Sequence, residues 1–307
     1  MNDTYKQIVK KLGKERAKID ESMVKHTTFK IGGPSDLFYE AKTEKELVEA
    51  IKVAMEVGVP YFILGKGSNV LVGDKGIRGM VIKVQSSKFP LRPRSEASKV
   101  QNERIIAEAG VLLNDLVKFY VKNSFGGLEF LVGIPGSVGG AVRGNAGAWQ
   151  KNIGDKIVKV KILDEKGKIK YLNRQDCQFS YRNSRFKKTS EVILEAEFLV
   201  EKKEKKEIKK IIIEYRNKRK NQPAEASAGS IFINPKPYSA GEMIERCGLK
   251  GRKIGGAQIS PKHANFIVNL GGAKAKNVVA LITLAKNKVK EKFGIDLREE
   301  IVRVGEF

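Results

Sequence analysis

The residues with the clearest chemical potential are the glycines between residues 126 and 149. Eight glycines occur there, at positions 126, 127, 133, 136, 139, 140, 144 and 147. Apolar residues such as Leu128, Phe130 and Val142 alternate with them and favour burial. Backbone this rich in glycine is used where φ must be positive or where another group must approach closely. We therefore expect either a rigid cradle of amide N–H groups for a phosphate or pyrophosphate, or a tight packing corner.

A second glycine turn, Gly65–Asn69, lies between two apolar segments, Tyr61–Leu64 and Val70–Val72. Strand, glycine turn and strand is the expected order, with two polar side chains in the turn. No helix follows the glycines and a third glycine is missing, so the turn differs from a Rossmann fingerprint. It is a second candidate anion cradle.

Composition limits the other kinds of chemistry. The chain has 307 residues, two cysteines and two histidines. Length predicts two or three domains, and the unpaired cysteine spacing excludes a disulfide framework. We expect no metal site. The charged N-terminal segment lacks the apolar core of a signal peptide, and no apolar run is long enough to span a membrane, so the expected location is cytoplasmic.

The net charge of +24 permits partners of several kinds, namely nucleic acid, an anionic membrane or a phosphorylated substrate. Residues 201–220 contain ten Lys and Arg against four Glu, with Ile208, Ile212 and Tyr215 at helical spacing. This pattern predicts an amphipathic helix with a solvated basic face. Because no nucleic-acid-binding motif accompanies the charge, we expect no nucleic-acid partner.

The elements that must position these residues alternate irregularly, which predicts an α+β fold. Thr43 and Glu46, and again Ser239 and Glu242, have the spacing of capping boxes that begin helices. Segments 37–41, 61–64, 80–83, 104–108 and 192–199 are predicted strands, and residues 158–171 a hairpin. A polar excursion is expected over residues 86–102, and helices over 113–123, 205–220 and 278–294.

Taken together, the two glycine stretches and the Gly229-Ser230 segment closely resemble the UDP-N-acetylenolpyruvoylglucosamine reductase family, in its shorter type without an extra tyrosine-bearing loop. The resemblance runs from about Thr27 to Glu306. It implies an FAD-binding domain of the vanillyl-alcohol-oxidase type over residues 24–202, with α+β subdomains at about 24–86 and 87–202. A lead-in over residues 1–23 precedes it, and a C-terminal α+β substrate-binding domain over residues 203–307 follows.

The resemblance also implies roles for single residues. Arg182 would stabilise the enol intermediate, Ser230 would protonate it, and Glu300 would be the acidic partner. Both glycine turns and an Asn-Ala-Gly segment would bind FAD: Gly65, Lys66, Gly67, Ser68, Asn69, Gly133, Ile134, Pro135, Gly136, Ser137, Gly139, Gly140, Asn145, Ala146 and Gly147.

The chemistry is consistent with these roles. Flavin performs the hydride chemistry that side chains cannot. An arginine fork suits a substrate carboxylate, and a positioned hydroxyl can donate a proton. Each residue has a plainer interpretation as well. Ser230 could cap a turn, Arg182 could be a surface residue, and Glu299 is an equal candidate for the acid. Arg303 stands one position from the arginine usual in the family, so either it substitutes or the contact is lost.

The expected function is reduction of UDP-N-acetylglucosamine enolpyruvate to UDP-N-acetylmuramate with NADPH through bound FAD. The enzyme would serve peptidoglycan precursor synthesis, and through it cell wall biogenesis, cell shape, cell cycle and cell division. The sequence leaves open NADPH against NADH and the oligomeric state, for which a monomer is plausible. The alternatives are an FAD-linked oxidase of the same fold and a basic nucleic-acid-binding protein. His263 is interpreted as a structural residue.

Overall fold

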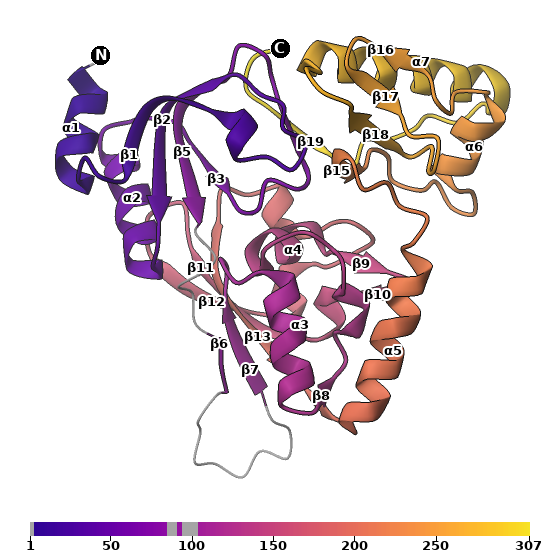
Figure 1. Ribbon diagram of the computed structural model, residues 1–307. Helices are drawn as coiled ribbons and strands as arrows, with labels where there is room; N and C mark the ends of the chain where they lie inside the picture. Colours follow the sequence, from indigo (N-terminus) through magenta and orange to yellow (C-terminus); the bar gives the residue numbers. More distant parts are fainter. Residues whose placement is uncertain (1–2, 85–90, 94–103) are drawn as a thin grey trace. The chain divides into compact units, whose positions relative to one another are not determined.

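The computed structural model describes residues 3–84, 91–93 and 104–307. The chain divides into two compact units (Figure 1). Unit 1 comprises residues 1–16, 39–66 and 82–220, and unit 2 comprises residues 17–38, 67–81 and 221–307. Each unit is therefore assembled from three separate segments of the chain. Apart from one short strand at residues 91–93, the predicted polar excursion at 86–102 lies outside the described residues.

Unit 1 contains a five-stranded sheet of order β12-β11-β13-β7-β6. Its strands are β6 (Leu91–Pro93), β7 (Arg104–Glu108), β11 (Ile157–Leu163), β12 (Ile169–Asn173) and β13 (Val192–Leu199). Neighbouring strands are antiparallel, and β11 and β12 form the predicted hairpin. The central strand β13 is almost completely buried, including its two glutamates, Glu195 and Glu197.

The helices of unit 1 are α1 (Asp3–Leu12), α2 (Glu44–Glu56), α3 (Leu113–Lys122), α4 (Val138–Gly144) and α5 (Lys205–Lys218). Of these, α2, α3 and α5 begin near the residues that the sequence predicts, whereas the short helix α4 within the glycine stretch was not predicted. The Thr43 hydroxyl accepts a hydrogen bond of 3.2 Å from the Glu46 N–H, which confirms the predicted helix start. In α5, Ile208, Ile212 and Tyr215 are buried beneath the basic face.

Short elements connect these helices and strands. The remaining strands of unit 1 are β3 (Tyr61–Leu64), β8 (Phe125–Gly126), β9 (Gly147–Ala148), β10 (Lys151–Asn152) and β14 (Glu201–Lys202). Its 3₁₀ turns are η3 (Glu129–Leu131), η4 (Ile153–Asp155), η5 (Gln175–Cys177) and η6 (Arg185–Lys187). Strands β2 (Pro34–Ala41) and β5 (Ile77–Val84) carry residues of both units.

Unit 2 is built on a sheet of order β15-β18-β17-β16. These strands are β15 (Ala226–Ser230), β16 (Lys253–Ile254), β17 (Ala257–Ile259) and β18 (Phe266–Asn269), with helices α6 (Ala240–Arg246) and α7 (Ala275–Phe293). Strand β4 (Val70–Val72) pairs in parallel with β19 (Val302–Val304). The unit also holds β1 (Ala17–Ser22) and η1 (Met23–Lys25).

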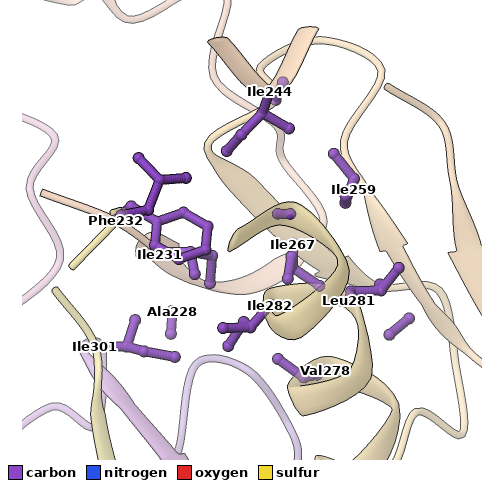
Figure 2. Packing of buried hydrophobic residues seen from close by; sticks show 14 of the residues in the cluster. Ala228, Ile231, Phe232, Ile244, Ile259, Ile267, Val278, Leu281, Ile282 and Ile301 are labelled. Carbon is purple, nitrogen blue, oxygen red and sulfur yellow. The ribbon is translucent and has the colours of Figure 1, made fainter. Parts of the chain in front are cut away.

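The core of unit 2 forms where apolar residues of α7 meet those of its sheet (Figure 2). Val278, Leu281 and Ile282 come from the helix, at the spacing the sequence predicts. The buried side chains of Ala228 and Ile231 flank residues 229 and 230. The mixed organisation of both units confirms the α+β class. In the described part of the chain, no helix is both long and apolar enough to cross a membrane.

Candidate functional site

The two glycine stretches meet in unit 1, although they are far apart in the sequence. A Cβ atom placed on Gly65 would collide with the Oγ atom of Ser137. Gly65 follows strand β3 directly, and Ser137 is the N-cap residue of helix α4. The backbone of the first stretch therefore lies directly against the second, as a shared cradle requires.

The segment before α4 is held rigidly by backbone hydrogen bonds. The carbonyl oxygen of Gly136 accepts from the Leu113 N–H at 3.0 Å, and the Val138 N–H donates to the Val111 carbonyl at 2.8 Å. Within residues 3–84, 91–93 and 104–307, the backbone N–H groups of Gly136 and Ser137 have no acceptor. Two such donors beside glycine backbone suit the anionic pyrophosphate of FAD. The residues present therefore fit the cofactor that the resemblance implies.

Other glycines of the same stretch make close packing contacts. The Gly139 N–H donates to the Ala109 carbonyl at 2.9 Å, and a Cβ on Gly139 would lie 2.9 Å from the Ala109 Cβ. A Cβ on Gly147 would strike the Lys151 carbonyl oxygen across the β9–β10 pair. The stretch therefore combines two features, N–H groups without an acceptor before α4 and close packing contacts within α4 and after it.

Asn145 ends helix α4 in the left-handed region, with φ 44° and ψ 57°. Its side chain is buried and is hydrogen-bonded through both the Nδ2 and the Oδ1 atoms within unit 1. The Nδ2 atom donates to the Ser180 carbonyl at 2.8 Å, and the Oδ1 atom accepts from the Gly154 N–H at 3.0 Å. The side-chain amide therefore joins three loops. The Ala146 N–H is likewise engaged, with the Ala141 carbonyl at 2.8 Å.

Arg182 lies in the turn that Asn145 holds. Its φ is +55°, an uncommon value for a residue with a side chain. Ser180 and Asn183 close the turn with two reciprocal backbone hydrogen bonds of 3.0 Å. The Lys187 Nζ donates to the Arg182 carbonyl at 2.7 Å. A backbone constrained in this way presents the Arg182 side chain in a defined direction.

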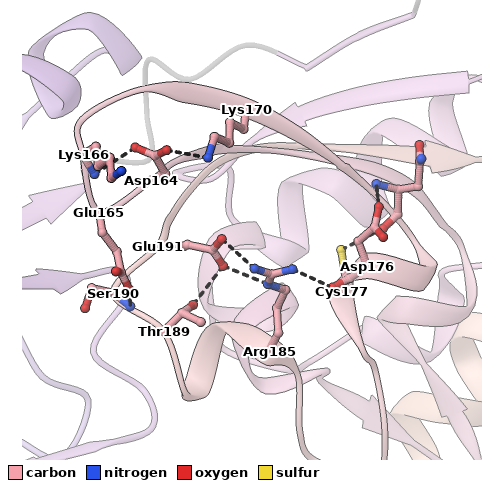
Figure 3. Close-up of polar contacts among 11 residues, drawn as sticks. Asp164, Glu165, Lys166, Lys170, Asp176, Cys177, Arg185, Thr189, Ser190 and Glu191 are labelled. Carbon is pink, nitrogen blue, oxygen red and sulfur yellow. Dashed lines mark hydrogen bonds and ion pairs between the residues drawn. The ribbon is translucent and has the colours of Figure 1, made fainter.

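The segment that follows Arg182 is anchored by Arg185 (Figure 3). The Arg185 Nε and Nη2 atoms donate to the two carboxylate oxygens of Glu191 at 3.0 and 2.9 Å. Nη1 donates to the Asp176 carbonyl at 3.2 Å. Such a two-pronged contact fixes direction as well as distance. The Arg182 turn is therefore held on both sides.

The second half of the Gly65–Asn69 turn belongs to unit 2. The Thr28 N–H donates to the Gly67 carbonyl at 3.0 Å, and the Thr28 hydroxyl donates to the Ser227 carbonyl at 2.7 Å. The Asn69 Nδ2 donates to the Glu300 carbonyl at 3.1 Å. Thr28 thus links this turn to the strand that carries Ser230, a role that nothing in the sequence pattern indicates.

Ser230 ends strand β15 after an irregularity in its pairing with β18. Ser227 pairs with Val268 and Ser230 with Phe266, and the register shifts between them. Gly229 has φ +76° and open space around it, so its conformation, and no close contact, calls for glycine. Among the described residues, the Ser230 hydroxyl has no hydrogen-bond partner, so it caps no turn.

Unit 2 brings Ser230 close to the C-terminal acidic residues. The Glu300 N–H donates to the carbonyl of Ile231, the neighbour of Ser230, at 2.8 Å. The Glu299 carboxylate is paired with two cationic side chains. It accepts a hydrogen bond from the Lys286 Nζ at 2.5 Å and two from Arg303 nitrogens at 2.8 Å. Burial alone would raise the pKa of Glu299, but the hydrogen bonds from Arg303 and Lys286 lower it.

These contacts bear on two alternatives. The Glu299 carboxylate belongs to an ion-pair cluster with Lys286 and Arg303, so its charge is already paired. Arg303 is committed to the same cluster, which favours loss of the displaced arginine's contact. His263 packs edge-on against Phe266 at 5.0 Å, and its Nδ1 accepts from the Asn265 N–H at 3.2 Å. These contacts support its structural interpretation.

The structure therefore groups the expected residues by unit. Unit 1 holds Gly65, Lys66, the 133–147 segment and Arg182, whereas unit 2 holds the 67–69 segment, Ser230 and Glu300. Sequence reasoning missed Thr28 and also Arg219, whose side chain packs beside Gly133. Arg219 carried no signal, because it is one of ten Lys and Arg residues within positions 201–220.

Two family models match the chain. Residues 35–173 match the FAD binding domain, and residues 222–304 match the UDP-N-acetylenolpyruvoylglucosamine reductase, C-terminal domain. Together they include both glycine stretches, Ser230 and Glu300.

Whole-chain relatives agree with this. The chain is 42% identical over 297 residues to a UDP-N-acetylenolpyruvoylglucosamine reductase of Clostridium botulinum (strain 657 / Type Ba4), covering 96% of this chain and 94% of the relative. It is 40% identical over 306 residues to that of Alkaliphilus oremlandii (strain OhILAs), covering 98% of each chain. The crystal structure of the reductase (MurB) from Thermus caldophilus superposes with a TM-score of 0.78 at 33% identity, covering 94% of this chain and 99% of that one. On sequence and structure alike, the chain belongs to the UDP-N-acetylenolpyruvoylglucosamine reductase family.

Proposed function

We propose that the protein reduces UDP-N-acetylglucosamine enolpyruvate to UDP-N-acetylmuramate, with NADPH as the reductant and FAD as the bound cofactor. The observation that carries the proposal is the meeting of the two glycine stretches at Gly65 and Ser137. Beside it, the N–H groups of Gly136 and Ser137 have no acceptor in the described part of the chain. Family membership supplies the substrate and the reaction.

Bound flavin would supply the hydride chemistry that no side chain can perform. The chain's own residues would bind and protonate the substrate. The constrained turn would position the Arg182 guanidinium to bind the carboxylate of the enolpyruvyl group. Negative charge develops on that group during the reaction, and an arginine would stabilise it. Ser230 would give its hydroxyl proton to C2, and Glu300 would be the acidic group beside it.

The rigid surroundings support these roles. Asn145 and Arg185 hold the Arg182 turn on both sides, so the guanidinium needs little ordering when substrate binds. The hydroxyl of Ser230 has no acceptor or donor in the described residues, so it is available to the substrate. The Glu300 backbone is fixed to Ile231 and to Asn69.

The wider setting follows from the reaction. Reduction of this nucleotide sugar belongs to peptidoglycan precursor synthesis, and so to cell wall biogenesis, cell shape, the cell cycle and division. We place the enzyme in the cytoplasm, acting without a nucleic-acid or membrane partner.

The decisive experiment is anaerobic. The purified protein should be yellow, and NADPH should bleach its flavin absorbance. The absorbance should return when UDP-N-acetylglucosamine enolpyruvate is added without oxygen. The rival function, an FAD-linked oxidase, requires that an alcohol bleach the flavin and that oxygen restore the absorbance. A colourless protein that binds no FAD on reconstitution would contradict both functions.

A further inference from the structure

An aromatic and cationic cluster lies at the C-terminal end of α5. The rings of Trp149 and Tyr215 stack with centroids 4.6 Å apart and planes inclined by 19°. The Arg219 guanidinium lies over the Trp149 ring, 4.7 Å from its centroid. Trp149 is held in a two-residue turn, where it and Gln150 both have positive φ, at 51° and 64°. This turn and helix α5 together fix the orientation of the stacked rings, and the Arg219 guanidinium packs against the Trp149 ring.

Arg219 extends from this plane to the FAD-binding stretch. A Cβ atom on Gly133 would lie 3.0 Å from the Arg219 Cδ, so glycine makes room for the arginine stem. The Nη2 atom donates to the Phe130 carbonyl at 3.3 Å. The Nε atom is buried without a hydrogen-bond partner, and among the described residues no carboxylate pairs with this side chain. A half-buried guanidinium without a carboxylate partner among the described residues is suited to bind an anion.

A second cation acts on Arg219. Burial is the larger cause that lowers the pKa of Arg219 to about 10, and the positive charge of Arg182 is the other. Both arginines belong to unit 1, and the positive charge of Arg182 makes the charged form of Arg219 less favourable. A bound anion between or beside them would relieve this repulsion.

We propose that Arg219 is a second substrate-binding arginine, which with Arg182 receives an oxyanion of the nucleotide-sugar substrate. The inference rests on the proposed function, because that substrate carries both a diphosphate and an enolpyruvyl carboxylate. A planar guanidinium already ordered by stacking on Trp149 binds such a group at low entropic cost. The two sources of the oxyanion are distinguished by experiment.

The test is calorimetric binding to the FAD-loaded protein, comparing wild type with Arg219→Gln. Two ligands are used, UDP-N-acetylglucosamine, which has the diphosphate only, and the full enolpyruvyl substrate. Loss of a charge-assisted hydrogen bond should weaken binding by about 10- to 100-fold. Equal weakening for both ligands assigns Arg219 to the diphosphate, and weakening for the full substrate alone assigns it to the carboxylate. Arg219→Lys should recover only part of the affinity, because it lacks the fork.

Lys218→Gln is the matched control. Lys218 lies over the same rings, 5.7 Å from the Trp149 centroid, and its replacement removes the same charge from the adjacent position. Equal weakening in both variants would overturn the inference in favour of a general charge effect. Unchanged binding in Arg219→Gln, or a loss of FAD in place of substrate affinity, would overturn it as well. If the wild-type protein bound neither nucleotide sugar, the proposed function itself would fall, and this inference with it.

Discussion

The Nδ2 atom of Asn145 donates a 2.8 Å hydrogen bond to the carbonyl oxygen of Ser180. Two predicted site segments, the Asn-Ala-Gly segment beside the cofactor stretch and the turn of Arg182, are therefore joined through one buried amide. A substitution in either segment should therefore also affect the structure of the other segment.

Asn145→Asp tests this link selectively. The aspartate keeps an oxygen for the Gly154 N–H but loses the donor to Ser180 and places a carboxylate against its carbonyl. We expect a loss of about 1–3 kcal/mol in the free energy of unfolding, together with weaker substrate binding. Urea unfolding and steady-state kinetics measure the two effects. Asn123→Asp, at the exposed C-cap of α3, removes a similar amide donor and should change neither quantity much. Equal effects of the two variants would contradict the link.

Gly139→Ala tests the packing interpretation of the glycine stretch. The new Cβ would lie 2.9 Å from the Ala109 Cβ, so α4 must shift, which should lower both the melting temperature and the FAD content. Gly144→Ala is the control in the same helix, because nothing lies within 4 Å of a Cβ there. It should be neutral or stabilising by up to about 1 kcal/mol, since alanine favours helix. If Gly139→Ala kept the melting temperature and the flavin absorbance of the wild type, α4 would tolerate a side chain at this position. That result would contradict the packing interpretation.

Ser230→Ala should separate the two halves of the reaction. Bleaching of flavin absorbance by NADPH requires no proton transfer to carbon and should stay near normal. Recovery of absorbance on adding substrate should slow by about 100- to 10,000-fold, which is the usual contribution of a general acid. Anaerobic stopped-flow measures each half. Ser227→Ala, in the same strand, should leave both unchanged. Equal slowing of both halves in Ser230→Ala would make Ser230 a structural residue.

The turn after β11 gives a pH prediction. The Lys170 ammonium, with the backbone N–H groups of Lys168 and Lys166, lowers the pKa of Asp164 from 3.8 to about 2 (Figure 3). Since the folded-state pKa is the lower one, the stabilisation is present above about pH 4 and is lost as the pH falls towards 2. Asp164→Asn should therefore be less stable than wild type in urea at neutral pH. The difference should vanish near pH 2, and a difference independent of pH would contradict the ion pair as its cause.

The net charge of +24 should attract the anionic substrate over long distances and so speed its binding. We expect kcat/KM to fall as salt is added, because screening shortens the range of the field, while kcat changes little. Kinetics between low and physiological ionic strength measure both. Tight, salt-resistant binding to a defined DNA or RNA would show a different role for the charge.

Local features of the fold were predictable from the sequence, because they depend on neighbours in the chain. The Thr43 cap, the hairpin of β11 and β12 and the buried face of α5 are examples. The candidate site residues were proposed chiefly through the resemblance, since spacing alone does not reveal that Glu300 lies beside Ile231. The packing role of Gly139 and the amide contacts of Asn145 depend on residues distant in sequence, which no local periodicity encodes.

The pairing of β4 with β19 also constrains how the protein is made. Asn69 and Glu300 are 231 positions apart, and the strands that follow them run side by side. A chain leaves the ribosome from its N-terminus, so β4 emerges long before its partner exists. Unit 2 therefore cannot complete its sheet pairing on the nascent chain. A premature stop that removed only the last few residues would leave β4 exposed, and such an unpaired edge invites contact with other chains.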